Sequence, residues 1–327
     1  MSWIESRREV MKTLEPYIDS FIDRFLTPIE KIWQPADLLP DAGRDTFFEE
    51  VRDLQGHARE LPYDFWAVLI GDTITEEALP TYESWLMDVV GVDQVKGNGW
   101  AKWVRAWTAE ENRHGDTLNK YLYLSGKVNM REMEVSTQYL ISDGFDLGTD
   151  LDPYRNFVYT SFQELATNIS HRRVGMMANK SGNRLLAKMC GYIAADEMRH
   201  ARAYKQFVKT IFEFDPSGMM LAFEDMMRKK IVMPAHFMRD MGSSMGEVFE
   251  HFSSAAQRLG VYTTHDYINI LRTLLKDWDI DKIGDLNDAA ERARDYLMAL
   301  PDRLARIANR VTVPQREFAF KWIVAPV

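Results

Sequence analysis

Two copies of the pattern Glu-x-x-His, each inside a long helix-like run, constrain this sequence most strongly. The first copy is Glu111 with His114, and the second is Glu197 with His200. Residues three apart share one face of an α-helix, so each pair presents a carboxylate and an imidazole to the same point. Burying such charged groups on an otherwise apolar face is costly unless something compensates them, and a metal ion would do so.

The stretches upstream of both pairs repeat as well. Glu76 precedes the first pair and Glu164 precedes the second at nearly the same separation, and both lie among apolar residues. The chain therefore contains two similar halves, each a helix with one Glu followed by a helix with Glu-x-x-His. Proteins of the ferritin-like class bind two metal ions in this way. A ligand set rich in oxygen and poor in nitrogen suits iron or manganese better than a structural zinc.

Spacing alone leaves the register of two ligands open. Glu77 is adjacent to Glu76, and either could face the site. Glu110 lies four residues before His114, so it shares roughly the same helix face as Glu111. Periodicity does not choose between the members of these two pairs.

Helical periodicity dominates the chain, and the expected architecture is an all-α bundle. Long helices joined by short breaks favour antiparallel neighbours, and Pro80 is expected to kink the first long run. No segment has the composition of a linker, so residues 1–327 are expected to form a single domain. The C-terminal stretch RVTVPQREFAFKWIVAPV is rich in β-branched and aromatic residues and predicts a hairpin or an extended strap. The long helical runs are expected at residues 63–90, 100–124, 154–179 and 184–214, with a shorter one at 130–142.

Charge and composition exclude several classes of protein. The net charge of −9 argues against a general nucleic-acid binder, because affinity for phosphates needs a cationic surface. No apolar run approaches the ~20 residues that cross a bilayer, and the N-terminal residues contain no signal-peptide block. A soluble chain without a membrane span is therefore expected. The single cysteine, Cys190, allows neither an internal disulfide nor a thiolate metal cluster within one chain.

Several stretches resemble the plant-type soluble acyl-acyl-carrier-protein desaturases. They include GDTITEEALPTY, RAWTAEENRHGDTLNKYLYLSG, YTSFQELATNISH, IAADEMRHARAY and FEDMMRKKIVMPAHFM, and the resemblance spans about residues 32–267. It implies a homodimeric ferritin-like bundle with additional helices, whose two iron ions are reduced by ferredoxin. The implied reaction uses O₂ to place a cis double bond in a saturated acyl chain on acyl carrier protein. The implied location is the cytoplasm for a bacterial chain and the plastid stroma for a processed plant chain.

The resemblance also assigns roles to individual residues. It places Trp33 and Asp196 beside His114, as a path into the metal site, and it places Thr167 on the oxygen-binding side as a proton donor. Without the resemblance, Thr167 would simply return its hydroxyl to the carbonyl of Gln163 within the helix, and Trp33 would be a core residue. The ligands that the resemblance implies are Glu76, Glu111, His114, Glu164, Glu197 and His200.

Two further groups are assigned by the same resemblance. Trp85 and Asn156 fall where the family has residues that line the acyl pocket, and both are bulkier than expected there. The acyl chain length and the position of the double bond therefore stay open. The basic run Arg228, Lys229 and Lys230 is expected to dock the acidic carrier protein, although charge patterning alone favours a solvated face.

Two other functions share this metal chemistry. A ribonucleotide reductase small subunit would need a tyrosine near the metals, and the candidates are Tyr82, Tyr123, Tyr159 and Tyr192. An iron-storage protein is usually shorter and would give no reason for the long C-terminal third. The remaining histidines considered have no acid in a comparable register and are expected to lie outside the site: His57, His236, His251 and His265.

Overall fold

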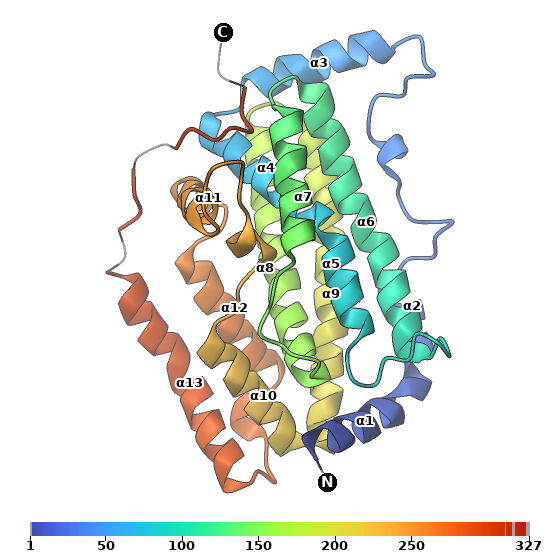
Figure 1. Cartoon of the computed structure of the whole chain (residues 1–327), viewed down its shortest axis with the longest axis vertical. Coiled ribbons are helices and arrows are strands. Elements are labelled where there is room, and N and C mark those ends of the chain that lie inside the picture. The colour runs from blue at the N-terminus through green and yellow to red at the C-terminus, as the bar shows by residue number, and fades with distance from the viewer. Residues whose placement is uncertain (1, 311, 316–317, 325–327) are drawn as a thin grey trace.

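The computed structural model describes residues 2–310, 312–315 and 318–324, and within them it contains α-helices and short 3₁₀ turns but no sheet (Figure 1). This confirms the predicted all-α class. The α-helices are α1 (Trp3–Leu14), α2 (Ile18–Phe25), α3 (Phe47–Arg59), α4 (Tyr63–Glu77), α5 (Leu79–Met87), α6 (Gly99–Ser125), α7 (Met130–Asp143), α8 (Pro153–Lys180), α9 (Arg184–Phe214), α10 (Pro216–Lys229), α11 (Glu247–Leu259), α12 (Thr264–Asp277) and α13 (Asp288–Ala308).

Helices α4, α6, α8 and α9 form the core of the bundle. Helix α8 pairs with α9 along most of its length, α4 packs on α6, and α6 also contacts α9 (Figure 1). Glycines allow two of these helix pairs to approach closely. A β-carbon on Gly115 of α6 would lie 3.1 Å from the carbonyl carbon of Glu76, and one on Gly175 of α8 would lie 3.1 Å from Cβ of Cys190. Tight packing therefore brings the predicted ligand-bearing segments together.

The run predicted over residues 63–90 is two helices. Helix α4 ends at Glu77, and α5 begins at Leu79 with Pro80 in its first turn. Proline has no N–H, and its ring clashes with the carbonyl four residues earlier, here that of Glu76, so a continuous helix would be strained at this point. The regular helix is consequently interrupted at Ala78.

The other predicted helix ends agree with the structure to within a few residues, for reasons visible in the local sequence. Gly126 ends α6 in the left-handed conformation with φ of 68°. The Asp152 side chain accepts the N–H of Tyr154 at the start of α8, and Asp215 does the same for Gly218 in α10. Capping by short acidic side chains fixes both starts.

Peripheral helices enclose the core. Helices α10 and α12 cover α8 on one side, and α13 packs against both of them, while α1 and α3 cross opposite ends of the bundle (Figure 1). Buried Arg7 ties α1 to the end of the bundle. Its Nη1 lies 2.8 Å from Asp215, its Nε lies 3.2 Å from Asp152, and its guanidinium stacks on Tyr154 at 3.7 Å.

The C-terminal segment runs as an extended strap rather than a hairpin, as far as residues 312–315 and 318–324 describe it. Residues 311, 316–317 and 325–327 of that prediction lie outside the described residues. The strap joins the segment before α7 through one antiparallel bridge between Val128 and Ile323, and it joins α7 itself through the indole N–H of Trp322, which donates to Ser136 at 2.8 Å. Among the described helices, none combines the length and apolarity needed to cross a membrane.

Candidate metal centre

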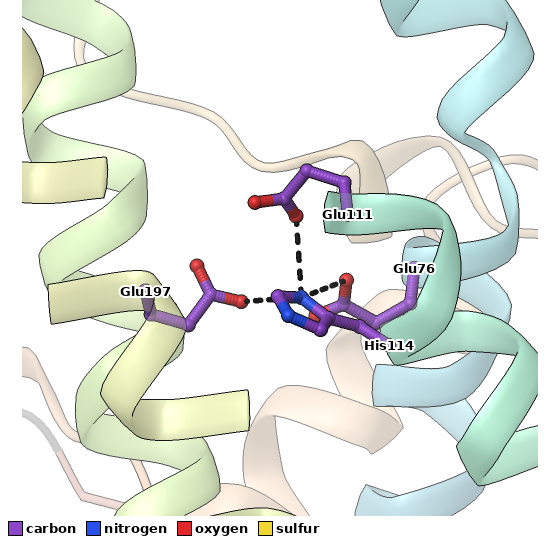
Figure 2. Close-up of side chains that lie close together, drawn as sticks. All are labelled: Glu76, Glu111, His114 and Glu197. Carbon is purple, nitrogen blue, oxygen red and sulfur yellow. Dashed lines mark ion pairs between the residues drawn. The ribbon is translucent and has the colours of Figure 1, made fainter. Parts of the chain in front are cut away.

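The six predicted ligand side chains converge from four helices. Glu76 comes from the last turn of α4, Glu111 and His114 from α6, Glu164 from α8, and Glu197 and His200 from α9. Figure 2 shows three of the carboxylates pointing toward the His114 ring. The Nδ1 atom of that ring lies 3.4 Å from Glu111, 3.3 Å from Glu197 and 4.0 Å from Glu76.

The ligand atoms form two overlapping groups, and all atoms within each group lie within 4.8 Å of one another. Glu111 and Glu197 belong to both groups, so each carboxylate could serve two metal positions. One group adds Glu76 and His114, and the other adds Glu164 and His200. The geometry thus provides two positions, each with one terminal carboxylate, one imidazole and two shared carboxylates.

Several inward-facing atoms of this cluster have no hydrogen-bond partner. Of the buried side-chain atoms that lack such a partner in the described part of the chain, five belong to residues of this cluster and converge on its centre. Buried polar atoms are normally hydrogen-bonded, so a convergent set of orphans indicates a missing binding partner. These atoms are carboxylate oxygens and imidazole nitrogens, and an imidazole binds metals in its neutral form. The set of donor atoms therefore fits divalent cations. The atoms are Oε1 of Glu111, Nδ1 of His114, Oε2 of Glu164, Oε1 of Glu197 and Nδ1 of His200.

Each histidine is held by an acid from the other half of the sequence. Nε2 of His114 lies 3.3 Å from Asp196 of α9, and Nε2 of His200 lies 2.9 Å from Glu110 of α6. An acid on the outer nitrogen fixes the ring orientation and leaves the inner nitrogen free for a metal. Glu110 therefore faces away from the site, and Glu111 faces into it. Glu77 also faces away and accepts a 2.6 Å hydrogen bond from Asn119.

Two arginines, which the sequence analysis did not single out, bind the supporting acids. Arg199 contacts Glu110 at 2.8 Å and Asp196 at 2.5 Å, and so joins the two outer carboxylates. Arg113 contacts Asp196 at 3.0 Å and stacks over Trp33 at 4.3 Å. Trp33 completes the network, because its indole N–H donates to Asp196 at 2.9 Å. The structure thus places Trp33 and Asp196 beside His114, where the resemblance expects them.

Thr167 makes the helix contact expected from the sequence and a second contact that was not predicted. Its hydroxyl lies 3.2 Å from the carbonyl of Gln163, as expected of a threonine within a helix. It also lies 2.8 Å from Oε2 of Glu197, one of the two shared carboxylates. The side chain therefore reaches the candidate site directly.

Two further side chains fix the terminal carboxylates. The indole N–H of Trp107 donates to Glu164 at 3.0 Å, and Nε2 of His171 lies 2.9 Å from Glu76. The sequence analysis did not identify His171. The signal that could have found it is its position seven residues after Glu164, which is the spacing of one helix face.

Burial and neighbouring charges control ionisation in the cluster. Burial raises the pKa of Glu164 well above its ordinary value, and repulsion from Glu111 adds to the rise. Burial acts on Glu111 in the same direction, but the adjacent His114 and His200 outweigh it and hold its pKa at about 2. Four carboxylates in one buried space repel one another strongly, and two divalent cations would balance their charge.

The two residues expected to line an acyl pocket make hydrogen bonds with residues outside the ligand cluster. The indole N–H of Trp85 on α5 donates to Thr149 at 3.1 Å, and the Asn156 amide donates to the Asp152 carbonyl at 2.9 Å. Both therefore contact the loop that precedes α8. Asn156 lies about two helical turns before Glu164, so this region flanks the cluster along the bundle axis.

The basic run at the end of α10 is largely paired within the protein. Arg228 contacts Glu224 at 2.6 Å and stacks on Tyr296 at 3.8 Å. Lys229 contacts Asp225 at 3.0 Å. Lys230 is exposed and has no ionic partner among residues 2–310, 312–315 and 318–324.

The tyrosines considered for radical storage are divided between core and surface. Tyr82 and Tyr159 are buried, whereas Tyr123 is 68% exposed and Tyr192 is 40% exposed. No hydrogen bond joins any of the four to a candidate ligand in the described structure. The four remaining histidines lie elsewhere: His57 against the Asp53 carbonyl, His236 stacked on Phe249, His251 stacked on Phe318, and His265 exposed.

Fold and site together define a helical-bundle protein with a buried carboxylate–histidine cluster suited to a pair of metal ions. Comparison with known families makes this specific. The chain belongs to the fatty acid desaturase family, whose family model matches residues 6–324.

Individual relatives agree with this assignment. The chain is 50% identical over 321 residues to the chloroplastic stearoyl-[acyl-carrier-protein] 9-desaturase of Ricinus communis, an alignment that covers 96% of this chain and 81% of that protein. It is 48% identical over 323 residues to the chloroplastic acyl-[acyl-carrier-protein] desaturase of Cucumis sativus, with 97% and 81% covered. Among solved structures, Mycobacterium tuberculosis DesA2, described as an acyl-ACP desaturase, matches 87% of this chain and 99% of its own. Its TM-score is 0.55 and its identity 16%, so this match supports the fold alone.

Proposed function

We propose that this protein is an acyl-acyl-carrier-protein desaturase that uses O₂ to introduce a cis double bond into a saturated acyl chain. The observation that carries the proposal is the pair of overlapping ligand groups that share Glu111 and Glu197. Membership of the fatty acid desaturase family and the names of the relatives supply the substrate class.

In this proposal the cluster holds two iron ions. Glu76 and His114 would hold one ion, Glu164 and His200 would hold the other, and Glu111 and Glu197 would serve both. When bound, the iron pair supplies the O₂ reduction and the oxidising power needed to remove two hydrogens from an unactivated chain. The four carboxylates suit hard oxygen-preferring cations, and the two imidazoles favour iron over magnesium or calcium.

The protein's own side chains prepare the site for that chemistry. Asp196 and Glu110 hold the outer nitrogens of His114 and His200, so both rings present their inner nitrogens to the ions. Thr167 holds Oε2 of Glu197, and its hydroxyl can release a proton toward the interior of the site. Burial of the cluster excludes water and so protects reactive species from side reactions.

Substrate length and regiochemistry are proposed to depend on the region of Trp85 and Asn156. Both side chains are hydrogen-bonded to the loop before α8, which fixes their positions rather than leaving them mobile. A large, fixed indole limits the depth available to an acyl chain. We therefore expect Trp85→Leu to shift preference toward longer acyl chains, and competition between two chain lengths in one assay measures this.

The decisive experiment supplies the iron-loaded protein with a reductant, O₂ and a series of acyl carrier proteins that bear different chain lengths. Mass spectrometry of the products then locates any double bond. A cis-monounsaturated product that depends on both iron and O₂ supports the proposal. A stable tyrosyl radical without unsaturated product would favour a reductase-like radical protein, and multi-iron loading without product would favour storage.

The carrier protein, ferredoxin and a second copy of this chain are the proposed partners. Docking of an acidic carrier needs a local basic patch, because the protein is acidic overall. Arg228 and Lys229 are already paired with acids, so the exposed Lys230 is expected to contribute most. Lys230→Glu should raise the KM for acyl carrier protein more than Lys229→Glu does, and the salt dependence of KM should weaken.

A further inference from the structure

Three aromatic rings lead from the protein surface to the candidate metal centre. The ring of Tyr192 on α9 lies 5.8 Å from that of Trp33, centroid to centroid. Trp33 stacks on His114 at 6.2 Å, with only 8° between the ring planes. Tyr192 is 40% exposed, whereas His114 is completely buried. The three rings thus form a continuous path between solvent and the innermost histidine.

The neighbours of these rings make Trp33 a short-lived site of oxidation and Tyr192 a longer-lived one. The indole N–H of Trp33 donates to the Asp196 carboxylate at 2.9 Å, and this negative charge favours loss of an electron from the indole. Arg113 stacks over the same indole at 4.3 Å, so a positive charge left on Trp33 would be repelled. Tyr192 faces solvent, where its phenol proton can pass to water. An oxidised Trp33 is therefore a transit point, and Tyr192 is the place where oxidation comes to rest.

We propose that Tyr192, Trp33 and His114 form a protective relay that carries stray oxidising equivalents from the metal centre to the protein surface. The relay rests on the proposed O₂-dependent function, and it acts when O₂ reacts at the reduced site without an acyl chain in place. It extends the path predicted through Trp33 outward to the exposed Tyr192, so that the electrons come from the protein's own side chains.

Each step of the relay conserves electrons and protons. Trp33 gives one electron toward the oxidised site through His114 and keeps its indole proton. Tyr192 then gives one electron to Trp33, while the phenol proton of Tyr192 passes to water. An external one-electron reductant such as ascorbate supplies one electron, water returns the proton, and tyrosine is restored.

The aromatic residues on the other side of the cluster do not offer the same exit. Trp107 contacts His200, with 6.3 Å between ring centroids, and continues to Tyr204 at 6.2 Å. Both Trp107 and Tyr204 are buried, at 0% and 1% exposure, and Tyr204 is occupied by a hydrogen bond from Trp103. If the oxidation reached Tyr204, the oxidised side chain would have no direct contact with water. The His114 side is therefore the favoured exit.

The test exposes iron-loaded protein to reductant and O₂ without acyl carrier protein, in the presence of a spin trap and catalase. Peptide mass spectrometry then locates the trap adducts. The wild type is expected to carry an adduct at Tyr192. Trp33→Phe should lose that adduct down to the level of metal-free protein, even though Tyr192 stays exposed, and its iron content is measured in parallel. Tyr192→Phe should lose the adduct and accumulate oxidised Trp33.

Tyr123→Phe is the matched control, because Tyr123 is 68% exposed but makes no ring contact with the path among the described residues. Its Tyr192 adduct should equal that of the wild type. Equal Tyr192 adducts in wild type and in iron-loaded Trp33→Phe, or no rise of Trp33 oxidation in Tyr192→Phe, would overturn the relay. Desaturation of acyl carrier protein by the wild type is measured separately, so the loss of the relay and the loss of the proposed function give different results.

Discussion

The hydroxyl of Thr167 donates a 2.8 Å hydrogen bond to Oε2 of Glu197, a carboxylate that belongs to both halves of the candidate metal centre. Thr167→Val keeps the side-chain shape and removes this hydroxyl. Iron content and fold should persist, with a change of about 1 kcal/mol in the free energy of unfolding. Product formed per O₂ consumed should fall, because the proton donor is lost. Comparing O₂ uptake with double bonds formed tests this, and unchanged coupling would rule the role out.

Removal of both histidines should empty the site. In the double variant His114→Ala, His200→Ala, each position keeps only carboxylates, so iron content should fall from about two ions per chain to a small fraction. Metal analysis after dialysis measures the loss, and circular dichroism checks that the helices persist. Retained stoichiometric iron would contradict the ligand assignment.

Glu110 of α6 lies against His200 of α9, and its effect on metal binding can be tested with an acid of α4 as the control. Glu110→Gln keeps the size of the side chain but removes the charge that faces Nε2 of His200 and Arg199. Iron affinity should fall by about 10- to 100-fold, as is typical when the partner of a metal-bound histidine is lost. Glu77→Gln, which changes an acid that points away from the site toward Asn119, should leave the affinity unchanged. Equal iron affinities in the two variants would contradict the interpretation that Glu110 holds His200 in place for the metal.

Close packing of α4 on α6 predicts a strong effect at one glycine. In Gly115→Ala the new β-carbon would lie 3.0 to 3.1 Å from atoms of Glu76 and Glu77, so α4 must shift. We expect a loss of about 1–3 kcal/mol in stability and weaker iron binding. Gly191→Ala is the control, because no atom lies within 4 Å of its β-carbon, and alanine there should stabilise the helix by about 0.5–1 kcal/mol. Urea unfolding of both variants provides the measurement.

Acid should weaken the contact between α8 and the start of α12. Burial raises the pKa of Asp266, but hydrogen bonds from Arg173 and Thr263 outweigh it, and the pKa lies below its ordinary value in the folded protein. An acid with a lowered folded pKa stabilises the protein above its unfolded pKa and loses that contribution as the pH falls through the folded value. Asp266→Asn should therefore cost about 1–3 kcal/mol at neutral pH and progressively less below about pH 4. A constant difference across that range would contradict the assignment.

Much of this architecture could be expected from the sequence, because its main signals are local. The spacing of Glu111 and His114, and of Glu197 and His200, depends only on helix geometry. The all-α class also follows from long periodic runs. The division of the first run at Ala78 is a local effect as well, since Pro80 cannot continue a helix from α4.

Other features depend on contacts between segments far apart in the chain, and sequence patterns do not report these. Arg199 bridges Glu110 and Asp196 only because α6 and α9 lie side by side. The choice of Glu111 over Glu110 as the inward residue is settled by the same packing. Lys229 appears as a free cation in the sequence, yet folding brings the carbonyl oxygen of Gly148 within 2.9 Å of its Nζ atom.

The contacts that Asp196 and Glu110 make with the two histidines also concern the evolutionary origin of the fold. Asp196 of the second half holds His114 of the first, and Glu110 of the first half holds His200 of the second, so the contact is reciprocal. Contacts in a two-fold symmetric dimer are reciprocal. If one residue of the first copy contacts a second residue of the other copy, the second residue of the first copy also contacts the first residue of the other. A gene duplication that fused two copies of one helix hairpin would inherit this arrangement complete. The difference of one methylene between Glu110 and Asp196 then marks where the two copies have since diverged.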